Sequence, residues 1–230
     1  MREKLFIIGA GATANNALQF VREYGLFDVA GFAVDAQYKG ADTFLGLPLY
    51  SIDELDKVVN KREDLLFVAI AWNRLNRDRK EAYERLKAMG YRFANLISPT
   101  ARVSGRIGGD NCWLNDYATI HNNAAIGANT VLWCYAYVAH DCTVGAHSFF
   151  ALRASMAGMS HVGEGCFLGI NSVVHDGVTV GNRCVIGANV SVEHSIPDFS
   201  VCKAARDSIV IQQFKEKTIE LLMTADIRNG

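Results

Sequence analysis

The sequence lacks an excess of charge of either sign. Its 23 lysines and arginines nearly balance 24 aspartates and glutamates, which gives a formal net charge of −1. A basic surface of the kind that binds nucleic acid or anionic membranes is therefore not expected. Half of the residues are hydrophobic and 20% are charged, as in an ordinary globular protein, and 230 residues are enough for two domains.

Long apolar runs are also missing. No run approaches the roughly 20 residues that a membrane-spanning helix needs. The first run, Leu5 to Ile8, stops at a glycine turn. A signal peptide needs a longer apolar segment, so we expect neither a signal peptide nor a membrane anchor.

In place of these features the sequence has a repeat with a period of six. A large apolar residue returns at every sixth position: Leu114, Ile120, Ile126, Leu132, Val138, Val144, Phe150, Met156, Val162, Leu168, Val174, Val180, Ile186 and Val192. Two residues before each of them stands a small or slender side chain. A period of six fits neither a helix nor a simple alternating strand, and it is the hexapeptide signature of a parallel β-helix. Three hexads then make one coil of a triangular prism, with the large residue pointing inward.

The six cysteines contain no CxxC pair, which is the usual sign of a zinc site. Four of them occupy the small inward position of the repeat: Cys112, Cys142, Cys166 and Cys184. We therefore interpret these four as core residues rather than as disulfides or metal ligands. Cys134 and Cys202 have no assigned role. Free cysteines favour a reducing compartment, and we expect a cytoplasmic protein.

The first hundred residues predict a separate α/β domain. A buried strand over residues 4–8 leads into the turn Gly9 to Ala14 and then a helix, which Gly25 ends. A second strand closes at Asp35. This β-α-β start with a G-x-G-x-x-A turn is typical of a Rossmann-like fold, in which backbone N–H groups at the helix start bind phosphate. About 97 residues hold only half of a dinucleotide fold, so an NAD-dependent dehydrogenase is not expected.

The alternation of helices and strands continues to the start of the repeat. Ser51 and Glu54 form a capping box that opens a short helix. A strand is predicted from Leu65 to Ala71, a helix over 77–89 and a last strand over 91–97. The predicted domains are a Rossmann-like domain over 1–97, a β-helix over 98–200 and a tail over 201–230. Helical apolar spacing in the tail predicts a helix over 207–223.

Three stretches carry a resemblance to a known family: the turn at Gly9 to Ala14, the segment from Phe67 to Ala101, and above all VAHDCTVG to FLGINS, from Val138 to Ser172. The chain resembles the sialic acid O-acetyltransferase and bacillosamine N-acetyltransferase family of bacterial sugar acyltransferases. The resemblance implies a left-handed β-helix, a homotrimer in the bacterial cytoplasm, and acetyl-CoA as acyl donor without a metal. It further implies N-acetylation of a nucleotide-linked amino-dideoxy sugar for surface polysaccharide such as the lipopolysaccharide O-antigen.

The resemblance also assigns the nucleotide-sugar site to the first domain. The loop that starts at Gly9 is expected to contact phosphates through Gly11, Ala12 and Thr13. Asp35 is expected near the base or the ribose. Trp72 and Asn73 are expected to line the same pocket. The family often has a glycine and a histidine in the first loop, where this chain has Thr13, Ala14 and Asn15, so contacts there differ.

The resemblance points to His140 as the general base, since acetyl transfer to an amine needs a group that removes a proton. Asp141 would orient the imidazole and raise its basicity. The N–H of Gly158 would polarise the thioester carbonyl. A surface His-Asp pair and a simple corner glycine are the alternatives. The family often has a further histidine where this chain has Phe149, and His147 is a candidate to replace it.

Coenzyme A is expected in the groove between two neighbouring prisms, mostly against backbone. The segment Gly169, Ile170 and Asn171 matches a family segment on that groove. Lys203 and Arg206 are candidates for contacts with the CoA phosphates. The surrounding sequence lacks the family's glycine and proline at this point, so the backbone geometry here departs from the family.

Three other interpretations stay open. The first is O-acetylation by the same fold. The second is a zinc hydrolase like the carbonic anhydrases with this prism, which would need histidines from two subunits, because His121 and His175 lie three coils apart in one chain. The third is a nucleotide-sugar binder without catalysis, which the intact His140-Asp141 pair argues against.

Overall fold

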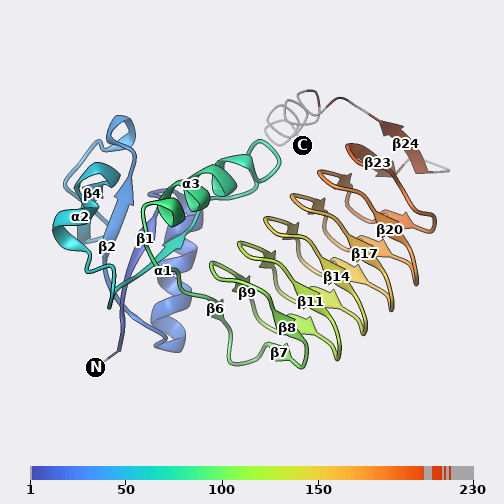
Figure 1. Ribbon diagram of the computed structural model, residues 1–230, viewed down its shortest axis with the longest axis horizontal. Coiled ribbons are helices and arrows are strands. Elements are labelled where there is room, and N and C mark those ends of the chain that lie inside the picture. The colour runs from blue at the N-terminus through green and yellow to red at the C-terminus, as the bar shows by residue number, and fades with distance from the viewer. Residues whose placement is uncertain (1, 205–208, 214, 216–217, 219–230) are drawn as a thin grey trace.

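A computed structural model describes residues 2–204, 209–213, 215 and 218. The chain has two parts, an α/β domain drawn in blue to green and a prism of stacked coils drawn in green to red (Figure 1). Helix α3 (Arg77–Ala88) lies where the two parts meet. Among the described residues, no helix is long and apolar enough to cross a membrane.

The α/β domain is built on one five-stranded sheet with the order β3-β4-β2-β1-β5. Its strands are β1 (Lys4–Ile8), β2 (Asp28–Val34), β3 (Thr43–Phe44), β4 (Leu47–Ser51) and β5 (Leu65–Val68). Its other helices are α1 (Ala12–Tyr24) and α2 (Leu55–Val58), with single 3-10 turns at Ala36–Tyr38 and Ile52–Glu54. Only β3 runs antiparallel to its neighbour. The parallel order agrees with the predicted β-α-β start.

The predicted helix boundaries in this domain are confirmed by their caps. Gly25 follows α1 with φ +58°, the left-handed conformation that ends helices, and its N–H bonds to the last turn of α1. Ser51 and Glu54 form the predicted capping box. The expected last strand over 91–97 is wrong, however. In that stretch the described chain makes only a single bridge at Phe93 and the two-residue strand β6 (Leu96–Ile97).

The prism has three sheets of short strands, which are parallel except for β24 at the end of the third sheet. Sheet I consists of β7 (Arg102–Val103), β10 (Thr119–Ile120), β13 (Tyr137–Val138), β16 (Ser155–Met156), β19 (Val173–Val174) and β22 (Ser191–Val192). Sheet II consists of β8 (Arg106–Ile107), β11 (Ala125–Ile126), β14 (Thr143–Val144), β17 (His161–Val162) and β20 (Thr179–Val180). Sheet III consists of β6, β9 (Trp113–Leu114), β12 (Val131–Leu132), β15 (Phe149–Phe150), β18 (Phe167–Leu168), β21 (Val185–Ile186), β23 (Ser200–Ala204) and β24 (Ile209–Gln213).

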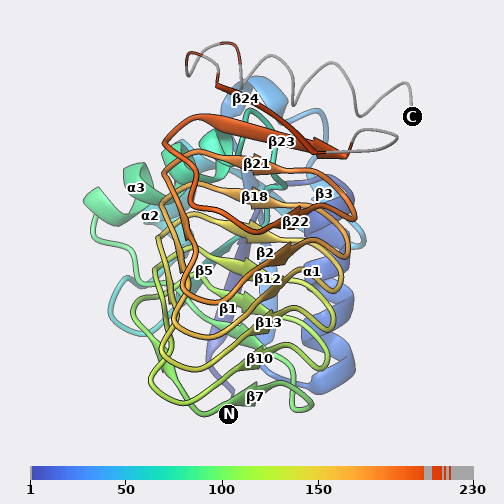
Figure 2. The same ribbon diagram turned by 90° about the vertical axis from the view of Figure 1, so that its right-hand side faces the viewer.

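The register of the coils follows the sequence repeat. Thr119 pairs with Tyr137 and Ile120 with Val138, so a partner lies 137 − 119 = 18 residues along the chain, or three hexads. The large repeat residues and the four inward cysteines form one buried core inside the prism. Figure 2 shows the coils stacked from β7 at one end to β23 and β24 at the other.

The corners of the prism also repeat every six residues. One residue in each corner has a left-handed backbone, in the order Asn111, Tyr117, Asn123, Asn129, Tyr135, Asp141, His147, Arg153, Met159, Gly165, Asn171, Gly177, Arg183 and Asn189. Asparagine and glycine tolerate this conformation best, which explains why they recur at these positions. Asp141 and His147 are held there by the same turn geometry.

The outer face of sheet III packs against the α/β domain. Phe20 of α1 and Phe67 of β5 each approach Trp113 edge-on, with ring centroids 5.7 Å apart. These rings belong to one buried cluster that joins β1, α1 and β5 to sheet III. The two parts of the chain therefore share a continuous apolar interface, and the sheet III surface is not free for other contacts along this length.

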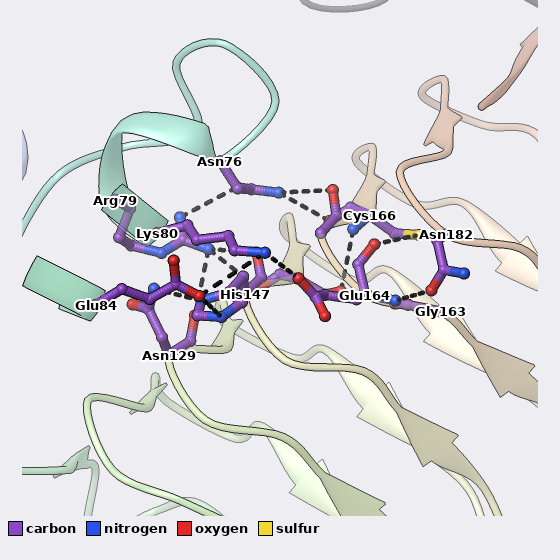
Figure 3. Close-up of polar contacts among 12 residues, drawn as sticks. Asn76, Arg79, Lys80, Glu84, Asn129, His147, Gly163, Glu164, Cys166 and Asn182 are labelled. Carbon is purple, nitrogen blue, oxygen red and sulfur yellow. Dashed lines mark hydrogen bonds and ion pairs between the residues drawn. The ribbon is translucent and has the colours of Figure 1, made fainter. Parts of the chain in front are cut away.

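A polar network closes the same interface beside α3 (Figure 3). Arg79 is 1% exposed and has no carboxylate partner among the described residues. Its guanidinium donates to the carbonyl oxygens of Asn129 (3.4 Å), His147 (2.9 Å) and Ser148 (3.3 Å). Asn76 donates to the carbonyls of residues 165 and 166 in the next corner. The helix is thus joined to the prism through backbone carbonyls.

The tail differs from its prediction in part. Where the sequence predicts the start of a helix, the chain forms β24, which pairs antiparallel with β23. The apolar spacing that indicated a helix is overridden by pairing with the last strand of sheet III. Apart from residues 215 and 218, the remainder of the expected helix lies outside the described residues.

Candidate active site

His140 and Asp141 lie side by side at the corner between sheets I and II. Nδ1 of His140 is 2.9 Å from Oδ2 of Asp141. A carboxylate only accepts hydrogen bonds, so Nδ1 carries the proton and the free lone pair is on Nε2. This hydrogen bond is the main reason why the pKa of Asp141 is lowered. Both side chains are about half exposed, so a ligand can reach them.

The carboxylate of Asp141 is fixed from two sides. Its Oδ1 accepts a hydrogen bond of 3.0 Å from Nδ2 of Asn123, one coil below. Its backbone is left-handed, with φ +59°, and its N–H bonds to the carbonyl of Asn122. The carboxylate therefore holds the imidazole in one tautomer and one orientation, as a histidine acting as a base requires.

Gly158 lies one coil above His140 and touches its ring. A Cβ at this position would lie 2.6 Å from both Cε1 and Nε2 of His140. In the described part of the chain the N–H of Gly158 donates to no backbone acceptor, while its carbonyl accepts from Gly177. The structure thus brings the three expected catalytic residues together and leaves one backbone donor beside Nε2.

A second group of expected residues meets at the glycine turn. Gly9 has φ +124°, and a Cβ there would lie 2.9 Å from the carbonyl oxygen of Ala69, so only glycine fits. Gly11 is the N-cap of α1, which begins at Ala12 and carries Thr13 in its first turn. The first N–H groups of a helix lack partners within it and attract anions. The turn is therefore suited to a phosphate group, as expected.

A polar cleft lies beside this turn, between the end of β2 and α3. It comprises two adjoining cavities of about 300 and 560 Å³ that share Asp35, Tyr38 and Arg85. Asp35 accepts a hydrogen bond of 2.7 Å from Arg85, and Asn73 lines the outer part of the cleft. Asp35 and Asn73 thus line one cleft, as expected.

Trp72 belongs to a different cavity, which corrects its expected place beside Asp35. This aromatic cavity, of about 540 Å³, lies between the α/β domain and the outer face of sheet III. All three tryptophans of the chain line it, together with Phe67, Phe149 and Phe167 among others. It also borders Ala12 and Thr13, so the glycine turn separates the polar cleft from the aromatic cavity.

The aromatic cavity is the part of the site that the sequence did not predict. The residues of sheet III that line it, such as Phe149, face outward and are direct neighbours in the sequence of the inward repeat residues. The repeat therefore does not distinguish them from other outward residues. The ring of Phe149 lies 4.9 Å from that of Trp72 and stacks on Phe167 at 5.7 Å. The signal available in the sequence was the return of aromatic residues one coil apart on a single face of the prism.

His147 does not take over the role of the family histidine at position 149. It is 6% exposed and lies at the other corner of sheet II, against α3. Nδ2 of Asn129 lies 2.8 Å from Nδ1 of His147 and donates to it, so the imidazole is neutral. Burial lowers the pKa of His147 to about 4. The residue is therefore part of the domain interface rather than of the site at His140.

The expected CoA segment lies at the corner between sheets III and I. Ile170 is exposed and lines the rim of the aromatic cavity, between Gly169 and Asn171. Nδ2 of Asn171 bonds to Asn189 one coil above at 2.9 Å. Lys203 is exposed on β23. Arg206 lies outside the described residues, so its expected role remains a prediction.

The described residues contain no group of three or more histidine, cysteine or acidic side chains placed to hold a metal. His175 bonds instead to Ser191 at 2.7 Å. His121 lies 6.4 Å from His140, ring to ring. Within one chain the described residues thus bring His121 and His140 together but provide no third ligand beside them.

The structure thus combines a prism of hexapeptide coils, a histidine-acid pair on one corner and a phosphate-type turn in the preceding α/β domain. The bacterial transferase hexapeptide family (six repeats) matches residues 159–194. PerB from Caulobacter crescentus, solved with CoA and GDP-perosamine, superposes with a TM-score of 0.79 at 28% identity, over 91% of this chain and 97% of PerB. No curated protein matches the chain.

Two further structures share the fold. The acetyltransferase domain of PglB from Neisseria gonorrhoeae, in complex with acetyl coenzyme A, superposes with a TM-score of 0.78 at 21% identity, over 92% of this chain and all of that domain. WeeI from Acinetobacter baumannii superposes with a TM-score of 0.76 at 21% identity, over 90% of this chain and 99% of WeeI. These findings confirm the predicted resemblance and the fold, an α/β domain followed by a left-handed β-helix, and place the chain in the acyltransferase class.

Proposed function

We propose that the chain is an acetyl-CoA-dependent N-acetyltransferase that acts on a nucleotide-linked amino-dideoxy sugar. The observation that carries this proposal is the contact between His140, oriented by Asp141, and the backbone of Gly158. A base with its lone pair on Nε2 and an available backbone donor beside it are the two groups that transfer of an acetyl group to an amine requires.

In the proposed reaction the sugar amine attacks the thioester carbonyl carbon. The C–N bond forms, and the C–S bond breaks when the tetrahedral intermediate collapses. Nε2 of His140 takes the proton from the nitrogen and returns it to the departing thiolate of CoA. While His140 holds the proton, the carboxylate of Asp141, hydrogen-bonded to Nδ1–H, stabilises the imidazolium. The N–H of Gly158 stabilises the oxyanion of the tetrahedral intermediate.

The order of the cavities supports a nucleotide-linked acceptor. The polar cleft with Asp35 and Arg85 would hold the nucleoside, and the turn at Gly9 to Thr13 the diphosphate. The sugar would then extend past Thr13 into the aromatic cavity, where Trp72 can pack against its ring. The relative solved with GDP-perosamine is a precedent for such an acceptor, at 28% identity.

A second copy of the chain is needed to complete this arrangement, in line with the proposed homotrimer. His140 lies at the corner between sheets I and II, whereas the aromatic cavity lies on sheet III, the remaining face of the prism. One chain therefore keeps its own base away from its own sugar cavity. Packing of prisms side by side would bring His140 of one copy to the cavity of the next, with CoA between them.

The closest alternative is O-acetylation by the same residues. A hydroxyl is a weaker nucleophile than an amine and needs fuller activation by the base, and the site offers a single histidine-acid pair. This favours the amine. A role in surface polysaccharide synthesis, such as the O-antigen, follows from the proposed acceptor class.

The test is release of free thiol from acetyl-CoA with a panel of UDP-, dTDP- and GDP-linked 3-amino and 4-amino dideoxy sugars. We expect release with one sugar and its loss in His140→Ala, with unchanged melting temperature. Release with no amino sugar, but with a hydroxyl sugar, would establish the O-acetyltransferase instead. Unchanged turnover in His140→Ala would overturn the assignment of the base.

A further inference from the structure

The β-helix contributes only apolar residues to the described wall of the aromatic cavity. These residues come from four successive coils and are Trp113, Val131, Trp133, Phe149, Ala151, Leu152, Phe167 and Ile170. Each of them faces outward from the prism, on the side where the α/β domain packs. Trp113, Val131, Phe149 and Ala151 are buried by this packing, whereas Leu152 and Ile170 remain exposed at the rim.

The side chains that form this wall become smaller along the prism. In one outward column of sheet III the residue is Trp133 on one coil, Ala151 on the next and Gly169 on the next. The small side chains at Ala151 and Gly169 leave room above the indole of Trp133. Phe149 and Phe167 stack beside this space with their rings 13° from parallel.

Polar side chains enter the cavity only from the α/β domain, among the described residues: Thr13, Asn16 and Arg79. Arg79 keeps its positive charge; its guanidinium donates to backbone carbonyls and to Oδ1 of Asn76, and its Nε is buried without a partner among the described residues. Thr13 and Asn16 lie together on the first turns of α1, beside the phosphate turn. One side of the cavity is therefore polar and suits a sugar, while the β-helix side is apolar.

The volume exceeds what an acetyl group needs. A cavity of about 150 Å³ lined by aliphatic and aromatic side chains is large enough for benzene. The aromatic cavity, at about 540 Å³, is more than three times as large. Its rim at Leu152 and Ile170 is apolar and more than a third exposed, so it opens toward the corner where CoA is expected.

We propose that this apolar side receives the acyl chain of the donor, and that the preferred donor carries an acyl group of about four to six carbons rather than acetyl. This inference rests on the proposed acyl transfer to an amino sugar and replaces acetyl by a longer acyl group as the preferred one. The chemistry is unchanged: the amine nitrogen bonds to the acyl carbon, the C–S bond breaks, and the proton passes through His140 to the CoA thiolate. The chain of the acyl group lies over Ala151 against Phe149 and Phe167.

A second hexose in this space would be a poor fit. Its hydroxyl groups would face apolar walls, and each buried hydroxyl without a partner costs about 1–3 kcal/mol. An acyl chain has no such groups, and each CH₂ that it buries strengthens binding about fourfold. The chemistry of the wall therefore favours the acyl chain over further polar parts of the acceptor.

The first test compares donors with the wild-type enzyme and one amino-sugar acceptor. We expect kcat/KM for butyryl-CoA to exceed that for acetyl-CoA by about 15-fold, two CH₂ groups at about fourfold each. In Ala151→Leu the butyryl-to-acetyl ratio should fall toward one. Ala125→Leu, a matched change on the outer face of β11, should leave the ratio unchanged. A ratio of one or less in the wild type would overturn the proposal and leave acetyl transfer standing.

The second test needs no turnover, because all three tryptophans of the chain line the cavity. Tryptophan emission, excited at long wavelength to avoid adenine absorption, is titrated with CoA, acetyl-CoA, butyryl-CoA and hexanoyl-CoA. We expect a shift with the two longer chains that CoA alone does not produce. Equal responses to all four ligands would overturn the proposal. If no donor supports acyl transfer but the longer chains shift the emission, the proposed function fails and the acyl site stands.

Discussion

The ring of His140 and the backbone of Gly158 are in direct contact, one coil apart. A Cβ at position 158 would lie 2.6 Å from Nε2 of His140, closer than real side chains approach. The absence of a side chain at 158 thus sets the position of the base. It also keeps the N–H of Gly158 open to a ligand that reaches Nε2.

Replacement of Gly158 by alanine is predicted to displace the imidazole. The new methyl group would push Nε2 away from the acceptor and crowd the thioester. A misplacement of about 1 Å in a catalytic group can lower the rate about 100-fold. We expect kcat to fall by about that factor, with the melting temperature within a few degrees of wild type, as measured by thiol release and thermal unfolding.

The matched control is Gly40→Ala. No atom lies within 4 Å of the Cβ that this change adds, so neither activity nor stability should change beyond about 0.5 kcal/mol. Equal activity of Gly158→Ala and Gly40→Ala would show that the contact with His140 has no catalytic role.

Replacement of Asp141 by asparagine is predicted to lower kcat about 10- to 100-fold with little change in KM. The amide can keep the left-handed backbone and a hydrogen bond to Nδ1, but it removes the negative charge that stabilises the imidazolium. Initial rates over a range of sugar concentrations separate the two constants. A rise in KM with unchanged kcat would instead indicate that Asp141 binds the substrate.

The prism was predictable because the six-residue repeat marks the side chains that are buried. The inward positions carry either a large apolar side chain or a small one, and they are buried in the structure. The inward cysteines illustrate the point: Cys112, Cys142, Cys166 and Cys184 are each 0% exposed. His140, Asp141 and Gly158 could be placed in space for the same reason, since residues 18 apart in the sequence stack on the same corner.

The outer contacts of the prism were not predictable, since a repeat says which side chains face outward but not what covers them. Phe149 and Trp113 face outward and are buried by the α/β domain. Helix α3 is rich in charge, yet Arg79 on it is fully buried. Its partners include backbone carbonyls, which every residue has, so the residue types in the sequence do not indicate these hydrogen bonds.

The buried imidazole of His147 predicts a loss of stability in acid. Burial, with Lys80 and Arg79 nearby, lowers its pKa from 6.5 to about 4, despite the opposing charge of Glu164. Between these pH values the unfolded chain takes up a proton that the folded chain does not, so stability falls as the pH falls from about 6.5 toward 4. We expect a contribution of about 2 kcal/mol to this loss.

Urea unfolding of the wild type and His147→Gln at pH 7 and pH 5 measures this contribution. Glutamine can accept the hydrogen bond from Asn129 and does not titrate, so the variant should lose less stability between the two pH values. Identical losses in both proteins would show that other groups cause the acid sensitivity.

Removal of the guanidinium of Arg79 is predicted to weaken the interface between the two parts of the chain. Burial lowers the pKa of Arg79 only to about 9, so it stays charged at neutral pH. Arg79→Met keeps much of the apolar bulk but leaves the carbonyls of Asn129 and His147 without their side-chain donor, while that of Ser148 keeps its bond from the N–H of Val131. We expect a loss of about 3–5 kcal/mol in the free energy of unfolding.

Urea unfolding of Arg79→Met is compared with that of Lys57→Met, whose side chain is 75% exposed and forms only a surface ion pair. Lys57→Met should change stability by less than about 0.5 kcal/mol. If Arg79→Met is equally mild, the apolar contacts of Trp113 and its neighbours, with the remaining polar contacts such as that of Asn76, are enough to hold the domains together. If it is severe, the aromatic cavity depends on Arg79 for its shape, because the guanidinium lies 5.8 Å from the ring of Phe149 and binds the corner beside it.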